Sequence, residues 1–197
     1  MIAVILLAGS LAACDRGPRL APLPADAVIL AFGDSLTAGQ GVSPEQSYPA
    51  VLARLSGRRV VNAGVPGEVT ADGLARLPDV LDETRPQLLL LLHGGNDILR
   101  NLDPVQAAGN LSAMVRQARA RGIGVVLIGV PEKRLFSDSS PIYQALAERE
   151  ALVFEGEIIA ELVRSPAMKS DAVHFNASGY ERLAQTLHAL LNKAGAW

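Results

Sequence analysis

The run AVILAFGDS at residues 27–35 joins six consecutive apolar residues to three that favour a turn. An apolar run without polar alternation is typical of a strand that is covered on both faces of a sheet. Glycine, aspartate and serine directly after such a run indicate a turn at its carboxyl end, because these residues form local hydrogen bonds there. The stretch therefore predicts a buried strand that ends at the hydroxyl group of Ser35.

Four more apolar runs recur along the chain and alternate with amphipathic stretches. The runs predict strands at 59–62, 87–92, 123–130 and 151–154. The stretches between them predict helices at 48–55, 70–83, 104–121, 142–150 and 156–163, with a last helix at 177–192. Strand followed by helix, repeated in this way, predicts an α/β fold with a mostly parallel five-stranded sheet and helices on both faces, a single-domain α/β/α sandwich.

Three helix boundaries have a local chemical reason. Asp103 offers a side-chain acceptor before Pro104, whose fixed φ suits the first helical position. Gly122 accepts the left-handed conformation that ends a helix, and Asn176 is a capping residue before the last helix.

Composition limits the classes of function. The 197 residues are 49% hydrophobic and carry a formal charge of −2, with no cluster of five or more Lys and Arg residues. Nucleic acid is therefore not an expected partner, since its binding requires many cations on one face. The three histidines lack metal-ligand spacing and no phosphate-binding glycine loop is present, so we expect no metal and no cofactor.

Polar residues follow three of the predicted strands, in the segments 33–35, 62–64 and 94–97. Because ligands bind outside the carboxyl ends of parallel strands, we expect these segments to form one site. A fourth segment, Asp171 to His174, precedes the last helix. A serine needs an adjacent base, itself oriented by a third group, to act as a nucleophile, so Ser35, His174 and Asp171 predict a serine hydrolase.

These segments together resemble the four blocks of the GDSL or SGNH hydrolase family. Ser35 matches the nucleophile, Gly64 the glycine, Asn96 the asparagine of a Gly-x-Asn-Asp block, and His174 the histidine of an Asp-x-x-His block. The resemblance spans residues 27–180 and implies a flavodoxin-like fold. The segments 44–48, 62–65 and 67–70 are most similar to the branch that contains arylesterases, lysophospholipases and acyl-CoA thioesterases. One position departs from the family's pattern, because Phe175 stands where proline often follows the histidine.

The chemistry assigns a role to each of these side chains. Ser35 attacks an acyl carbonyl, His174 accepts its proton, and Asp171 orients the imidazole. The backbone N–H groups of Ser35 and Gly64 and the side-chain amide of Asn96 are the expected donors to the oxyanion.

The remaining acids and imidazoles near these segments have structural roles in this interpretation. Asp34 and Asp97 are expected to brace their loops by hydrogen bonding. His93 is expected to be a structural histidine, and His188 to lie at the surface of the last helix.

We expect an esterase that acts on carboxylic esters, and also on thioesters or lysophospholipids. A carbohydrate O-acetyl esterase of the cell envelope and a tethered binding protein without turnover are the alternatives. The segment 131–141 is expected to line the acyl or alcohol side of the pocket. Its apolar Leu135 and Phe136, with the adjacent Ile142 and Tyr143, favour an acyl chain.

Residues 1–13 form an uncharged apolar leader that ends in small residues before Cys14, the only cysteine. The leader resembles a bacterial lipoprotein signal peptide, which implies cleavage before Cys14 and acylation of that residue. Residues 14–26, with three prolines, are expected to form a lipid-anchored tether, and residues 27–197 the hydrolase domain. The resemblance implies a protein held on a bacterial membrane and facing the periplasm.

Overall fold

A computed structural model describes residues 17–133 and 138–197. The leader and Cys14 lie outside these residues. Five strands form one all-parallel sheet in the order β2-β1-β3-β4-β5, with β1 at Val28–Gly33, β2 at Arg59–Gly64, β3 at Leu88–Leu92, β4 at Gly124–Ile128 and β5 at Val153–Glu155. The predicted α/β sandwich with five strands is therefore confirmed, and the sheet is parallel throughout.

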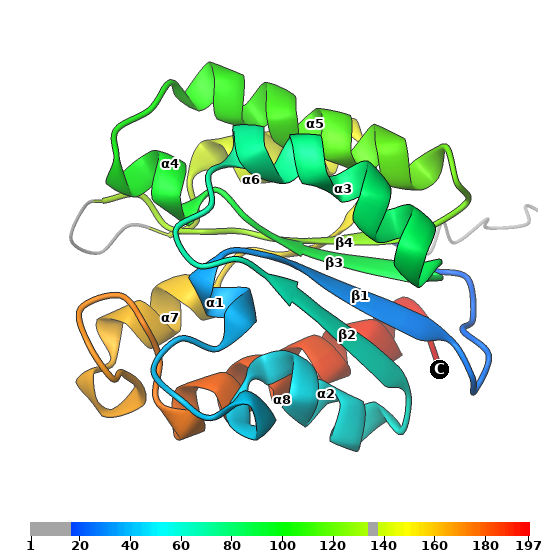
Figure 1. Cartoon of the computed structure of the whole chain (residues 1–197), viewed down its shortest axis with the longest axis horizontal. Coiled ribbons are helices and arrows are strands. Elements are labelled where there is room, and N and C mark those ends of the chain that lie inside the picture. Colours follow the sequence, from blue (N-terminus) through cyan, green and yellow to red (C-terminus); the bar gives the residue numbers. More distant parts are fainter. Residues whose placement is uncertain (1–16, 134–137) are drawn as a thin grey trace, which may run out of the picture.

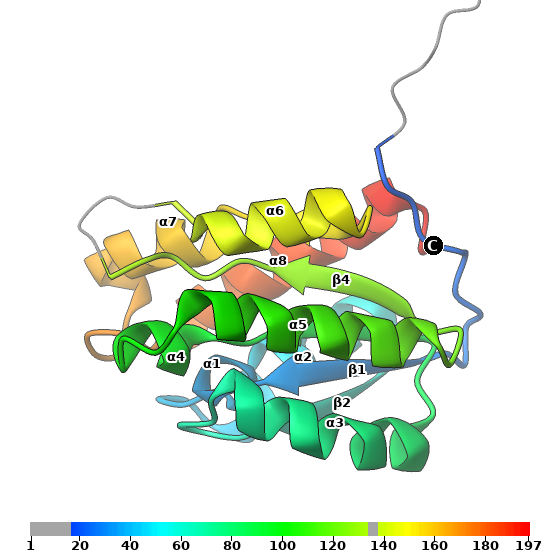
Figure 2. The ribbon, with the colours of Figure 1, turned by 90° about the horizontal axis from the view of Figure 1, so that it is seen from above.

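Helices cover both faces of this sheet (Figures 1 and 2). One layer contains α3 (Thr70–Thr84), α4 (Gly95–Leu99), α5 (Pro104–Arg119) and α6 (Pro141–Arg149). The other contains α1 (Ser35–Ala38), α2 (Tyr48–Ser56), α7 (Ile158–Arg164) and α8 (Ala177–Ala194). Two short 3₁₀ helices lie at Pro44–Gln46 and Pro166–Met168.

The core lies along the central strands. All five residues of β3 are leucines and at most 1% exposed, because helices pack on both sides of this strand. Strand β2 differs: it lies at the edge of the sheet, and its residues are half-buried or exposed. The predicted strand at 59–62 was therefore right in position, but it is not covered on both faces.

The caps that the sequence predicts are present. The Asp103 carboxylate accepts a hydrogen bond from the Val105 N–H at 2.8 Å, and the Asn176 side chain accepts one from the Gly179 N–H at 3.0 Å. Each cap of this kind typically stabilises a protein by about 1 kcal/mol. Gly122 has a φ of +74°, in the left-handed region. The Asn176 cap fixes the start of α8 at Ala177, three residues after His174.

Residues 17–26 form no helix or strand, yet they are attached to the domain. The Leu20 N–H donates to the Ala194 carbonyl at 3.0 Å and the Leu23 N–H to the Ala196 carbonyl at 2.8 Å. The Arg58 guanidinium donates to the carbonyls of Leu23 and Pro24. The prolines in this segment do not prevent docking, because the two leucines between them keep their N–H groups. The packed domain thus begins near Leu20 rather than at Ala27.

Candidate active site

The nucleophile candidate lies at the point where β1 ends and α1 begins. Ser35 is the first residue of α1, and the Asp34 carboxylate caps this helix by accepting a hydrogen bond from the Leu36 N–H at 3.1 Å. Asp34 is buried, and this burial raises the pKa of its carboxyl group. The expectation that Asp34 braces its loop is confirmed by this bond. The Ser35 hydroxyl is thereby held at the carboxyl edge of the sheet.

A chain of two hydrogen bonds connects Ser35 to His174 and Asp171. The Ser35 Oγ lies 3.0 Å from His174 Nε2, and His174 Nδ1 lies 2.7 Å from Asp171 Oδ2. A carboxylate only accepts hydrogen bonds, so Nδ1 carries the imidazole proton and Nε2 is free to accept the hydroxyl proton of Ser35. The structure thus brings together three side chains that the sequence separates by up to 139 residues.

The loop before α8 holds this arrangement in place. One oxygen of Asp171 accepts the backbone N–H groups of Val173 and His174, both at 2.8 Å, while the other binds the imidazole. The hydrogen bond from His174 is the main cause that lowers the pKa of Asp171 to about 2, and the two backbone N–H groups add to it. The carboxylate therefore stays ionised although about half of its side chain is exposed.

Asn96 reaches the same region from α4. Its Nδ2 donates to the backbone carbonyl of Glu68 at 3.0 Å and lies 3.4 Å from Asp34 Oδ2. The neighbouring Asp97 carboxylate accepts both the backbone N–H and the hydroxyl of Thr70, at 2.9 and 2.6 Å. This pair ties α4 to the first turn of α3, so Asp97 braces its loop as expected.

Gly64 does not present a free amide. Its N–H already donates to Asn62 Oδ1 at 3.0 Å. The structure therefore contradicts the expectation that this amide is open to an oxyanion, because a neighbouring side chain occupies it.

Gly67 lies three residues later and differs from Gly64 in exposure, backbone conformation and hydrogen bonding. It is exposed, has a φ of +81°, and its N–H finds no acceptor among residues 17–133 and 138–197. Its carbonyl accepts a hydrogen bond from Arg100 at 2.7 Å. The sequence motif 62–65 predicts Gly64 as the donor, whereas it is Gly67 whose N–H group is open.

A cavity of about 490 Å³ adjoins this site. Asn96 and His174 lie in its wall, and its apolar lining comes from Leu36, Ile98, Leu99, Val130, Ile159, Val163 and Val173. Pro131, Glu132 and Lys133 of the predicted pocket segment also line it, while Leu135 and Phe136 lie outside the described residues.

Three residues with predicted or suspected roles in the pocket lie elsewhere. Tyr143 is buried and donates its hydroxyl to the His93 carbonyl at 2.8 Å, and Ile142 packs against the core. The expectation that these two favour an acyl chain from inside the pocket is wrong, because α6 turns them toward the core. Phe175 is also buried, with its ring 5.5 Å from that of Tyr180, and it is not among the residues that line the cavity.

The two remaining histidines contribute no group to the chain of bonds around Ser35. His93 is fully buried and hydrogen-bonded to Glu68 at 3.0 Å, as expected of a structural histidine. His188 is half-buried on α8, with its ring 5.2 Å from the ring of Trp197.

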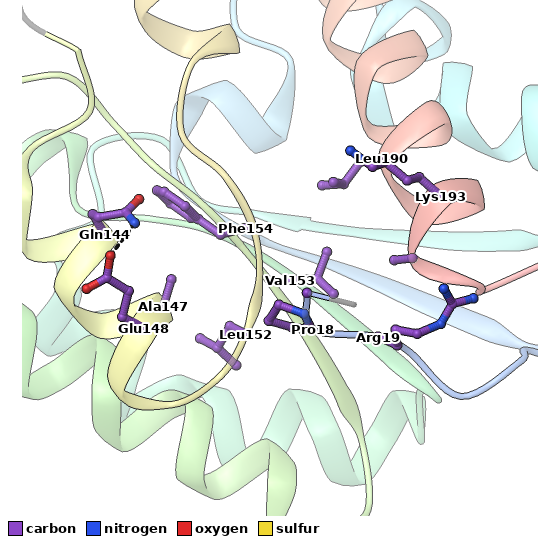
Figure 3. A pocket seen from close by; sticks show the side chains of 12 residues that line it. Pro18, Arg19, Gln144, Ala147, Glu148, Leu152, Val153, Phe154, Leu190 and Lys193 are labelled. Atoms are coloured by element: carbon purple, nitrogen blue, oxygen red, sulfur yellow. Dashed lines mark hydrogen bonds between the residues drawn. The ribbon is translucent and has the colours of Figure 1, made fainter. Parts of the chain in front are cut away.

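A second cavity of about 510 Å³ lies beside the edge strand β5 and residues 17–19 (Figure 3). Leu152, Val153 and Phe154 line it from the start of β5, and Arg19, Lys193 and Glu148 lie around it. Gln144 and Glu148, which also line it, hydrogen-bond to each other at 2.6 Å. None of the predicted site residues borders this cavity.

Comparisons with known proteins identify one family. The sequence profile of the GDSL-like lipase/acylhydrolase family matches residues 31–182. The chain is 36% identical to the esterase TesA of Pseudomonas aeruginosa over 172 residues, which cover 81% of this chain and 85% of that protein. It is 31% identical to the thioesterase 1/protease 1/lysophospholipase L1 of Escherichia coli K12 over 176 residues, covering 83% and 85%. A crystal structure of TesA superimposes with a TM-score of 0.78 at 30% identity, covering 85% of this chain and 99% of that one.

The bond between Asp171 and His174 predicts how the carboxylate titrates. By carbon-13 NMR of the side-chain carboxyl group, Asp171 should titrate with a pKa of about 2. His174→Ala should raise this pKa toward 3.8, because the largest stabilising hydrogen bond to the charged form is lost. The backbone N–H groups at 173 and 174 should keep it from rising fully. His188→Ala is the control and should leave it unchanged. An unchanged Asp171 titration in His174→Ala would contradict the geometry.

Proposed function

Because the chain belongs to the GDSL-like lipase/acylhydrolase family, and is an acyl ester hydrolase, we propose that Ser35, His174 and Asp171 carry out its reaction. The observation that carries this proposal is the unbroken path from Asp171 Oδ2 through the imidazole of His174 to Ser35 Oγ. Ser35, His174 and Asp171 are thus connected in the order nucleophile, base and orienting acid, as acyl transfer requires.

The steps follow from the protonation states. His174 Nε2 takes the hydroxyl proton of Ser35 as Oγ attacks the carbonyl carbon, and it then returns that proton to the leaving alcohol or thiol. Water attacks the acyl-enzyme in the second half, with the same imidazole as base, and Ser35 regains its proton. The ionised Asp171 stabilises the imidazolium in both halves.

We assign three donors to the oxyanion. The N–H of Ser35 is at the first position of α1, where no intrahelical acceptor exists. Asn96 Nδ2 has one hydrogen on Glu68 and a second that makes only the 3.4 Å contact with Asp34. The open N–H of Gly67 takes the place expected of Gly64, whose amide is engaged by Asn62. The loss of one such donor typically slows turnover about 10²- to 10³-fold.

The adjoining cavity supports an acyl chain as the group bound next to the carbonyl. Its apolar wall suits hydrocarbon, and Asn96 and His174 lie in the same wall. An acetyl group would leave most of this volume unused, which disfavours the O-acetyl esterase alternative. Thioesters and lysophospholipids remain proposed substrates, since the leaving group would lie outside this cavity.

Removal of the Ser35 hydroxyl tests the proposal directly. Ser35→Ala should retain the fold but lose nearly all hydrolysis of a short nitrophenyl ester, and it should not react with a fluorophosphonate probe. Ser178→Ala, at an exposed position on α8, is the control and should keep both activities. Wild-type turnover in Ser35→Ala, or a probe adduct at another residue of the wild type, would reject the assignment.

A series of nitrophenyl esters from acetyl to decanoyl tests the cavity. We expect kcat/KM to rise with chain length, because each buried methylene group contributes up to about 0.8 kcal/mol. Val163→Phe should abolish the preference for long chains by filling the cavity, while Val105→Phe, whose native side chain is 77% exposed on α5, should not. A preference for acetyl esters together with fast hydrolysis of acetylated sugars would instead favour the alternative.

We also propose that Cys14 is acylated and holds the domain on a membrane. Cys14 lies outside the described residues, and the proposal is supported by the leader that precedes it. No helix among residues 17–133 and 138–197 is long and apolar enough to span a bilayer. Residues 17–23 run beside the carboxyl end of α8, at the end of the sheet opposite Ser35 (Figure 1). An anchor at Cys14 would therefore leave the site facing away from the lipid.

Cell fractionation tests the anchor. Wild-type protein should sediment with the membranes of the expressing bacterium, and Cys14→Ser should move to the soluble or precursor pool. Ser10→Ala, within the leader, is the control and should not change the distribution. An unchanged distribution of Cys14→Ser would reject the anchor and leave the proposed ester hydrolysis unaffected.

A further inference from the structure

Glu68 places an ionised carboxylate inside the protein, and the proposed steps of ester hydrolysis make no use of it. Its side chain is only 6% exposed. Arg76 binds both of its oxygens, with Nε 2.8 Å from Oε1 and Nη2 2.7 Å from Oε2, and His93 Nε2 lies 3.0 Å from Oε2. Burial opposes the charge, but the hydrogen bonds from His93 and Arg76 outweigh it and hold the pKa of Glu68 at about 2.

The same residue reaches the oxyanion donor Asn96 by two routes. The first is direct, because the Glu68 backbone carbonyl accepts a hydrogen bond from Asn96 Nδ2 at 3.0 Å. The second runs through His93. The Gly94 N–H donates to His93 Nδ1 at 2.9 Å, so Nδ1 carries no proton and Nε2 donates to the Glu68 carboxylate. Glu68, His93, the backbone from Gly94 to Asn96, and the Asn96 amide thus form a closed ring.

Arg76 connects this ring to the neighbouring strands. Its Nη2 also donates to the Ala63 carbonyl, at the end of β2, at 3.2 Å. Its guanidinium carbon lies 4.2 Å from the centroid of the Phe32 ring, three residues before Ser35. The Arg76 side chain therefore contacts the ends of β1 and β2 while it fixes Glu68, which in turn fixes Asn96.

We infer that Glu68, held by Arg76 and bonded to His93, is a positioning residue that orients the Asn96 amide toward the oxyanion. This inference rests on the proposed role of Asn96. An amide that is fixed before the reaction needs no reorganisation when charge develops on the carbonyl oxygen. Loss of the ring should therefore weaken the hydrogen bond from Asn96 to the oxyanion. Because this bond forms mainly in the transition state, kcat falls and KM stays nearly unchanged.

A double-mutant cycle separates positioning from a general effect on the fold. The four proteins are wild type, Glu68→Gln, Asn96→Ala and the double variant, assayed with one nitrophenyl ester. Glu68→Gln should lower kcat about tenfold or more in the wild-type background, with KM within about twofold. In the Asn96→Ala background the same change should alter kcat less than about twofold, because the donor that it positions is gone. Glu83→Gln, at an exposed position on α3, is the matched control and should have no effect in either background.

Each outcome of the cycle has a distinct meaning. Equal losses from Glu68→Gln in both backgrounds, or no loss in the wild-type background, would overturn the positioning role and leave the proposed function intact. Full activity of Asn96→Ala alone would instead overturn the oxyanion role of that residue. If thermal melting shows that Glu68→Gln does not fold, Arg76→Lys replaces it, since it keeps the cation but loses the two-pronged contact with Glu68. The same non-additive loss is then expected, and an additive loss overturns the inference.

Discussion

The pairing of β1 with both β2 and β3 is the constraint on which the site depends. Its register sets Gly33 level with Gly64 on one side and with Leu92 on the other. A side chain at Gly33 would overlap the Leu92 carbonyl and the Thr37 hydroxyl, so this position must be glycine. Because the three strands end at the same level, the loops that carry Ser35, Glu68 and Asn96 leave the sheet side by side.

Hydrogen bonds to three carboxylates then hold the proposed reacting groups in place at this edge of the sheet. Asp34 caps the helix that begins at Ser35, Asp97 ties α4 to Thr70, and Asp171 folds its own loop around His174. Asp34 and Asp171 accept hydrogen bonds from backbone N–H groups within three residues, and Asp97 accepts them from the N–H and the hydroxyl of Thr70. The proposed reacting groups are therefore held by carboxylates whose partners are fixed by the fold. His174 is already in the tautomer that can accept a proton from Ser35.

Much of this arrangement follows from sequence patterns, and the exceptions have physical reasons. All five strands and six helices were predictable, because the strands lie in continuous apolar runs and the helices are long enough to show an amphipathic repeat. The helices α1 and α4 were not, since four or five residues are too few for a repeat. The residues of the proposed triad were identifiable by type and spacing. The hydrogen bond from the Gly64 N–H to Asn62 was not, because it depends on the rotamer of the Asn62 side chain. The docking of residues 17–26 depends on contacts with the carboxyl-terminal end of the chain. These contacts join residues far apart in the sequence, so no local sequence pattern predicts them.

A crystal structure of the enzyme after reaction with a phosphonate ester would test the central claim most directly. The phosphorus atom stands for the tetrahedral carbon, and one of its oxygens for the oxyanion. The account predicts a covalent bond to Ser35 Oγ, with that oxygen within hydrogen-bonding distance of the Ser35 N–H, Asn96 Nδ2 and the Gly67 N–H, while Gly64 keeps its bond to Asn62. A phosphorus atom bound elsewhere, or an oxygen directed away from Asn96, would contradict the account.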